Sequence, residues 1–94
     1  MKQIRVIAIS GDSCANCYSV SKQIMSFKDT YKDVEFSSLE ASENPAFISK
    51  YKVEYVPTIL ILKGEEEIAR ARGYQPEEIL EIWLEDKIEK AREE

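Results

Sequence analysis

The chain has two cysteines, Cys14 and Cys17, which lie three positions apart in the stretch GDSCANC. Two thiols at this spacing can form a redox-active disulfide, supply half of a metal site, or act as a structural clip. The chain has no histidine, which excludes Cys/His catalytic pairs and every metal site that uses histidine. Two thiolates do not complete a tetrahedral zinc site, so a metal or cluster site requires a dimer in which each chain gives two.

The residues around the pair predict a strand, a short loop and a helix. Residues 4–9 are apolar apart from Arg5 and lack helical spacing, which is typical of a buried strand. A helix face follows Gly11 at spacings of three and four residues: Cys17, Val20, Ile24, Phe27 and Tyr31. We therefore expect a helix that begins in or beside the cysteine pair, with Asp12 or Ser13 as its cap.

The same periodicity predicts different surroundings for the two sulfur atoms. Cys17 continues the buried stripe of the helix, whereas Cys14 lies one turn earlier, at the start of the helix and beside the loop. Free N–H groups and the positive dipole end at a helix start stabilise a thiolate. The hypothesis is that Cys14 is the exposed attacking thiol and Cys17 is the buried thiol that resolves a mixed disulfide.

The rest of the chain predicts three more strands and two more helices. A strand is expected at residues 34–39, and a helix from about Asn44–Pro45 that carries Phe47, Ile48 and Tyr51. Residues 59–62 and 68–71, joined by a turn at Lys63–Gly64, predict a hairpin. The last helix begins near residues 75–78, and its charged end at residues 89–94 is expected to fray. Its expected apolar face consists of Ile79, Leu80, Ile82, Trp83 and Ile88.

These elements predict one α/β domain, residues 1–94, in the order βαβαββα. A crossover helix makes the first two strands parallel and the hairpin is antiparallel, which gives a mixed four-stranded sheet flanked by helices. The net charge is −5 and the basic residues are scattered, so we expect no nucleic-acid or membrane partner. Arg5 interrupts the short apolar run at the N-terminus, which disfavours a secretory signal. We expect a cytoplasmic monomer.

Three segments resemble the thioredoxin superfamily: SCANC after a strand, KYKVEYVPTILIL downstream, and Gly73 before the last helix. The resemblance implies a thioredoxin-like fold that lacks the usual first strand and helix of thioredoxin. Pro57 is similar to the family's cis proline, which packs against the active-site sulfurs. In that position the backbone of Val56 would pair with a partner peptide as an extra strand.

The resemblance implies a thiol-disulfide oxidoreductase that reduces protein disulfides and is restored by a recycling thiol reductase. It implies no metal and no cofactor other than the Cys14–Cys17 pair itself. Around this pair, the residues expected to contact a substrate are Ser13, Ala15, Asn16, Val56, Pro57, Gly73 and Tyr74.

The chain also departs from the family pattern at several positions. Ser13 stands where thioredoxins usually have tryptophan, and Ala15-Asn16 where they have Gly-Pro, so the reduction potential does not carry over. Ala8 and Ser38 occupy the places of the family's buried aspartate and its lysine partner. Two other functions therefore stay open: a binding or regulatory module around Val56 and Tyr74 with a slow redox pair, and the metal- or cluster-bridged dimer.

Overall fold

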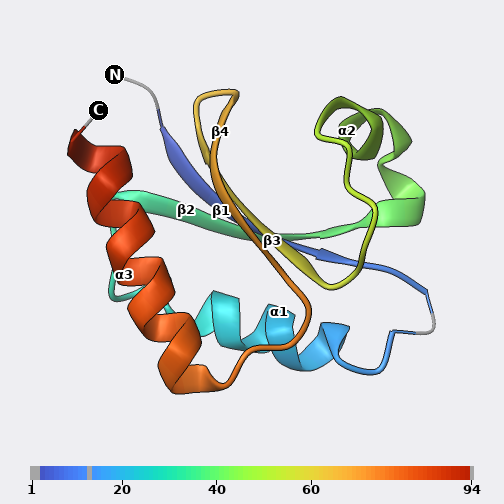
Figure 1. Cartoon of the computed structure of the whole chain (residues 1–94), viewed down its shortest axis with the longest axis horizontal. Coiled ribbons are helices and arrows are strands. Elements are labelled where there is room, and N and C mark those ends of the chain that lie inside the picture. Colours follow the sequence, from blue (N-terminus) through green and yellow to red (C-terminus); the bar gives the residue numbers. More distant parts are fainter. Residues whose placement is uncertain (1–2, 13, 94) are drawn as a thin grey trace.

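The computed structural model describes residues 3–12 and 14–93 (Figure 1). Its elements follow the expected βαβαββα order, with a short 3-10 turn, η1, added before the second helix. They are β1 (Ile4–Ser10), α1 (Cys17–Ser26), β2 (Val34–Glu40), η1 (Ala41–Glu43), α2 (Pro45–Lys50), β3 (Thr58–Lys63), β4 (Glu66–Arg72) and α3 (Glu77–Glu93).

The strands form one mixed sheet in the order β2-β1-β3-β4. β1 is parallel to β2 and antiparallel to β3, and β3 and β4 form the antiparallel hairpin. The parallel register aligns Ser10 with Glu40, so β1 and β2 end at the same edge of the sheet. The α1 helix connects these two parallel strands, as a crossover must. The predicted sheet is confirmed.

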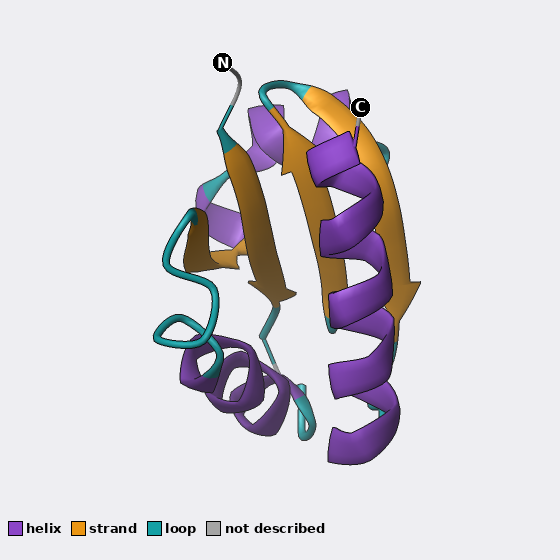
Figure 2. Ribbon diagram, turned by 90° about the vertical axis from the view of Figure 1, so that its left-hand side faces the viewer, coloured by secondary structure: helices purple, strands orange, loops and turns teal. Residues whose placement is uncertain are grey.

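Helices cover both faces of the sheet (Figure 2). On one face, Val6 and Ala8 of β1 share a buried cluster with residues of α1 and α3. On the other face, Ile7 and Ile9 share a second cluster with α2. A strand that is covered on both sides is apolar at successive positions, which explains the continuous run in β1. No helix in the described part of the chain is long and apolar enough to span a membrane.

The structure corrects two predictions about α1. The residue at the N-cap position is Asn16 and not Asp12, and the Asn16 side chain makes no capping hydrogen bond. Ser13 lies outside the described residues. The helix ends at Ser26, so Tyr31 is not part of it, although Tyr31 still packs against the same buried cluster. The spacing of three and four residues between apolar side chains continues beyond Ser26. The turns after the helix therefore place the Tyr31 ring against the core, although their backbone is not α-helical.

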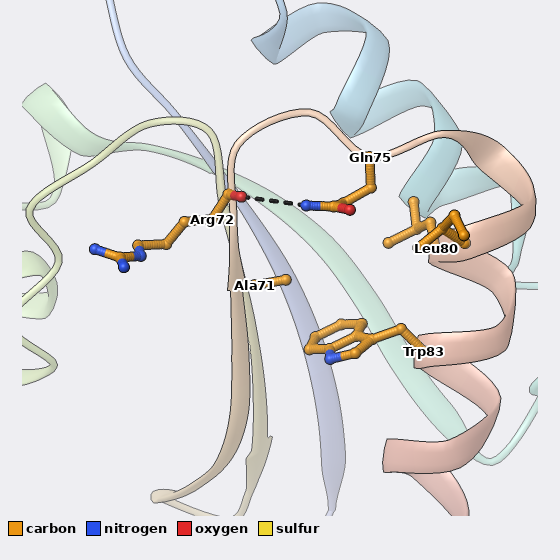
Figure 3. A pocket seen from close by; sticks show the side chains of 6 residues that line it. Ala71, Arg72, Gln75, Leu80 and Trp83 are labelled. Atoms are coloured by element: carbon orange, nitrogen blue, oxygen red, sulfur yellow. Dashed lines mark hydrogen bonds between the residues drawn. The ribbon is translucent and has the colours of Figure 1, made fainter.

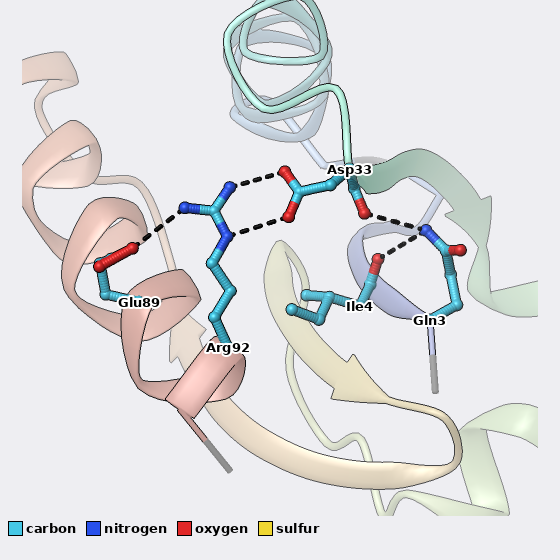
Figure 4. A network of polar contacts seen from close by, with 5 residues as sticks. All are labelled: Gln3, Ile4, Asp33, Glu89 and Arg92. Carbon is cyan, nitrogen blue, oxygen red and sulfur yellow. Dashed lines mark hydrogen bonds and ion pairs between the residues drawn. The ribbon is translucent and has the colours of Figure 1, made fainter. Parts of the chain in front are cut away.

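The structure also corrects the predicted face of α3. Its buried residues are Leu80, Leu84, Ile88 and Ala91, whereas Ile79 and Ile82 are 54% and 67% exposed. The true stripe follows spacings of four, four and three residues, and an aliphatic side chain outside it faces solvent. Residues 89–93 are helical. Arg92 binds Asp33 and Glu89, and the Lys63 ammonium donates a hydrogen bond to the Ala91 carbonyl, so the last turn is tied to the sheet (Figure 4).

Candidate active site

A disulfide joins Cys14 to Cys17, with an S–S distance of 2.08 Å and a Cα–Cα distance of 5.4 Å. Cys17 is the first residue of α1 and is 4% exposed, whereas Cys14 is half-buried in the turn that precedes the helix. The helix thus begins at the cysteine pair, as expected, and Cys14 precedes its first residue. The Cys17 N–H still donates to the Cys14 carbonyl at 3.4 Å, so the two residues share one tight turn.

The electrostatics of this turn favour negative charge on sulfur. The start of α1 has no side-chain cap and no acidic residue in its first turn. Its first backbone N–H groups therefore have no side-chain cap, and the positive end of the helix dipole lies at the cysteine pair. Backbone donors at a helix start stabilise an anion in general.

The loop that contains Pro57 lies beside the segment that leads to the cysteines. The Val56-Pro57 bond is cis, as the family resemblance implied. A Cβ placed on Gly11 would lie 3.0 Å from Cγ2 of Val56, so the backbone before the pair and this side chain are in close contact. The absence of a side chain at Gly11 permits this approach, and sequence periodicity has no signal for it.

Backbone hydrogen bonds bring Gly73 to the same loop. The Gly73 N–H donates to the Pro57 carbonyl at 2.8 Å, and the Thr58 hydroxyl donates to the Tyr55 carbonyl at 2.6 Å. Gly73 has a φ of 79°, which a residue with a side chain rarely adopts. The structure thus places Gly73 beside Val56 and Pro57, although it follows them in the sequence by a whole hairpin.

Several large apolar side chains are exposed on these loops and at the start of α1. Val56 is 38% exposed, Tyr74 is 50% exposed, Tyr55 is 54% exposed and Tyr18, which follows Cys17, is 75% exposed. The Arg72 guanidinium lies 4.7 Å from the centre of the Tyr55 ring. Ala15 and Asn16, between the cysteines, are exposed as well. Arg72 has no signal in the sequence as a site residue, because its contact with Tyr55 depends on how β4 ends beside the loop.

Ala8 and Ser38, which stand where the family has a buried aspartate and its lysine partner, are neighbours in the sheet. Ala8 pairs with Ser38 in the parallel register of β1 and β2. Ala8 is 1% exposed within the apolar cluster, and Ser38 is exposed. A buried carboxylate at position 8 would need a partner, so the joint loss of both charges leaves no orphan charge.

A separate hollow of about 200 Å³ lies between β4 and α3 (Figure 3). The Trp83 ring lies against Ala71, and the Gln75 side-chain amide donates to the Arg72 carbonyl at 3.4 Å. This hollow contains neither cysteine. Across residues 3–12 and 14–93, no three His, Cys, Asp or Glu side chains are placed to hold a metal ion.

Comparisons with known proteins agree with this geometry. The family model described as "Thioredoxin" matches residues 1–86. The chain is 30% identical over 77 residues to a thioredoxin of Alicyclobacillus acidocaldarius, covering 81% of this chain and 73% of that protein. It is 29% identical over 90 residues to thioredoxin H2 of Arabidopsis thaliana, covering 96% of this chain and 64% of that protein.

Two solved structures share the fold. A mutant thioredoxin from Halobacterium salinarum matches with a TM-score of 0.78 and 22% identity, over 92% of this chain and 75% of that one. Oxidised thioredoxin O2 from Arabidopsis thaliana matches with a TM-score of 0.76 and 24% identity, over 90% and 75%. The chain belongs to the thioredoxin family of thiol-disulfide oxidoreductases, and Cys14–Cys17 is its CxxC redox pair.

Proposed function

We propose that this protein reduces disulfide bonds of protein substrates by dithiol-disulfide exchange. The observation that carries the proposal is the unequal burial of the two bonded cysteines, Cys14 half-buried in its turn and Cys17 almost fully buried. A partner disulfide can approach Cys14 and not Cys17, so the roles of the two thiols differ.

The exchange takes place in two steps. The Cys14 thiolate attacks one sulfur of the substrate disulfide, which forms a mixed disulfide and releases the other substrate sulfur as a thiolate. Cys17 then loses its proton and attacks the Cys14 sulfur. The Cys14–Cys17 bond forms, the bond to the substrate breaks, and the substrate leaves as a dithiol. Two electrons have passed to the substrate, and a recycling thiol reductase returns two to the pair.

The substrate site in this proposal consists of residues on the loops around the disulfide. Val56 offers its backbone to an extended peptide, which adds to it as a short strand. The close contact between Gly11 and Val56 supports this assignment, since it holds the loop beside the cysteine turn. The other proposed contact residues are Ser13, Ala15, Asn16, Pro57, Gly73 and Tyr74.

The cellular setting is part of the same proposal. A reductant needs a steady supply of electrons, which a cytoplasmic thiol pool provides. The proposed partners are therefore protein disulfides and a cytoplasmic thiol reductase, and the protein acts as a monomer in one domain.

A binding module with a slow redox pair is the second candidate. The apolar side chain of Ala8, where the family has an acid, favours it, because no carboxylate at that position takes up the proton of Cys17. The variant Cys14→Ser distinguishes the two candidates, because each predicts a different result. Reduction of insulin disulfides falls to the uncatalysed rate if the pair is catalytic, and partner binding survives the substitution if the protein is a binding module.

A redox titration of the pair tests the direction of electron flow. The protein is equilibrated in graded dithiol buffers and the reduced fraction is read from the mass added by alkylation. A two-electron midpoint near about −270 mV supports a reductant, and one near about −120 to −180 mV indicates an oxidant or isomerase. A pair that stays oxidised below about −300 mV is a structural clip, which overturns the proposal.

A further inference from the structure

Glu40, the last residue of β2, has an unusual carboxylate. Its Oε2 atom is buried and has no hydrogen-bond partner. Among the described residues it is the only buried carboxylate oxygen without one. Buried polar groups are nearly always hydrogen-bonded because desolvation without a partner is costly, so an unpartnered oxygen calls for an explanation.

The sheet places Glu40 on the side of α1. Val34 and Phe36 of β2 pack into the cluster that contains α1, and side chains alternate along a strand, so Glu40 faces the same side. Its neighbour in the register is Ser10, the last residue of β1. Ser10 faces α1 as well, because its hydroxyl lies 3.2 Å from the hydroxyl of Ser21 on that helix.

The Ser10 and Ser21 hydroxyls link β1 to α1. Ser10 is the neighbour of Glu40 in the sheet, and Ser21 is on the same helix as Cys17. Ser21 follows Cys17 by one helical turn, so the two share a face of α1, and helical side chains lean toward the N-terminus. A serine hydroxyl is both a donor and an acceptor, so two in contact can pass a proton along. In order from β2 through β1 to α1, the residues are therefore Glu40, Ser10, Ser21 and Cys17, of which only the side chains of Ser10 and Ser21 are hydrogen-bonded to each other in this oxidised structure.

We infer that Glu40 takes up the proton of Cys17 through the Ser10–Ser21 hydroxyl pair. This inference rests on the proposed function, in which Cys17 attacks the mixed disulfide as a thiolate. As the Cys17 sulfur bonds to the Cys14 sulfur, its proton moves to the carboxylate, and the substrate leaves as a thiolate that takes a proton from water. Glu40 touches neither sulfur, so it is a positioning residue and not a catalytic one.

The other described acids on this side of the sheet are exposed, including all those of α3, which packs against the same cluster as α1. Tyr31 also packs on this cluster, but it is a phenol whose pKa is raised further by burial, so it is no proton acceptor. The α1-facing residues of β1 are Ile4, Val6, Ala8 and Ser10, none of which is charged. On α1, the titratable residues besides Cys17 are Tyr18, which is exposed, and Lys22, whose ammonium is a donor and not an acceptor. Glu43 in η1 and Asp12 in the loop before Cys14 are also exposed.

A chromogenic disulfide separates the two steps of the exchange. The reduced protein is mixed with one equivalent of dithiobis-nitrobenzoate. The attack by Cys14 releases the first thionitrobenzoate, and the attack by Cys17 on the mixed disulfide releases the second. An unassisted thiol with a pKa of about 8.5 is only about 3% thiolate at pH 7, so an acceptor speeds the second step by up to about thirtyfold there and by little above about pH 9.5.

Glu40→Gln is expected to slow the second release by about tenfold or more near pH 7, and to match the parent protein above about pH 9.5. The first release is unchanged. Glu40→Asp restores part of the rate, and Ser21→Ala slows the same step. Glu43→Gln removes an exposed acid from η1, the turn that follows Glu40, and has no effect, which controls for net charge.

Two results overturn the inference. One is a second release in Glu40→Gln as fast as in the parent protein near pH 7. The other is a slowing of equal size at every pH, because a structural defect does not depend on the thiolate fraction. Failure of the proposed function is a different result, since the first release would then be absent or would persist in Cys14→Ser. A thermal melt of Glu40→Gln that is unchanged or higher confirms that folding is intact.

Discussion

The end of the sheet that carries the cysteines differs from the opposite end in how polar groups are paired. At the opposite end, the Arg92 guanidinium donates to both carboxylate oxygens of Asp33, at 3.0 and 2.6 Å, and to Glu89 at 3.0 Å (Figure 4). The side chain of Gln3 donates to the Asp33 carbonyl nearby. Segments that are distant in the sequence are thus held together by charge-assisted and neutral hydrogen bonds.

At the cysteine end, some groups have no partner, although Gly73 and Thr58 donate hydrogen bonds to the loop around Pro57. The start of α1 has no side-chain cap, Glu40 buries an oxygen without a partner, and Tyr18 and Tyr74 are exposed. In the proposed function and the further inference, these groups serve as donors for a thiolate, an acceptor for a proton and an apolar surface for a substrate. The comparison indicates that charged side chains pair at the end away from the cysteines, whereas the loops at the cysteine end are held by backbone and hydroxyl hydrogen bonds.

The largest effect is expected at the cysteine end. Cys17→Ser removes the resolving thiol, so the mixed disulfide on Cys14 cannot break and multiple-turnover reduction of insulin falls to background. Mass spectrometry of the protein after one exposure to substrate should show the substrate still attached. If Cys17→Ser turns over like the parent protein, a different thiol resolves the intermediate and the division of roles is wrong.

The next largest effect is on the stability of the fold, and it concerns the buried cluster that α1 and α3 form with the sheet. Leu84 of α3 is 0% exposed, and Leu84→Ala should lower the free energy of unfolding by about 2–5 kcal/mol. Ile82, on the same helix but 67% exposed, is the matched control, and Ile82→Ala should change it by less than about 0.5 kcal/mol. Urea titrations measure both. Equal losses would contradict the corrected face of α3.

A smaller effect is expected where the loop before the cysteines meets Val56. In Gly11→Ala the added methyl lies 3.0 Å from Val56 Cγ2, so the partly exposed side chain must move. We expect a stability loss of about 1 kcal/mol, near the low end for overpacking, together with a raised KM for insulin. Adding Val56→Ala should restore stability in the double variant. Without such rescue, the two residues are not coupled.

The smallest effect is expected at the opposite end of the sheet. The hydrogen bond from Arg92 lowers the pKa of the Asp33 carboxyl below its ordinary value, so the pair stabilises the folded state when Asp33 is ionised. This contribution is present above the ordinary carboxyl pKa of about 3.9 and is lost as the pH falls through the lower value of the folded protein. Both side chains are partly exposed, so Asp33→Asn should cost about 0.2–1 kcal/mol at neutral pH.

The control for that prediction is its pH dependence. The difference in unfolding free energy between Asp33→Asn and the parent protein should shrink in acid, because the parent loses its ion pair there. High salt at neutral pH should also reduce the difference, since exposed charges are screened. A difference that grows in acid would contradict the assigned direction of the pKa shift.

Much of the fold follows from local patterns in the sequence. The apolar run before Gly11, the stripe from Cys17 to Ile24 and the hairpin around Gly64 each report which side of an element is buried, and the sheet has the predicted pairing. The face of α3 follows from the sequence only in part. Ile79 and Ile82 are aliphatic but exposed, and composition alone does not reveal which stripe meets the sheet.

The redox chemistry of this protein can be inferred from local sequence. Two thiols three positions apart, at the junction of a strand and a helix, define a possible disulfide, because their reach depends only on local backbone geometry. What surrounds these thiols depends on the tertiary fold. The contact of Gly11 with Val56, the bond from Gly73 to Pro57 and the buried oxygen of Glu40 all arise where segments distant in the chain meet. Such contacts depend on strand register and on the paths of loops, and no local periodicity records either.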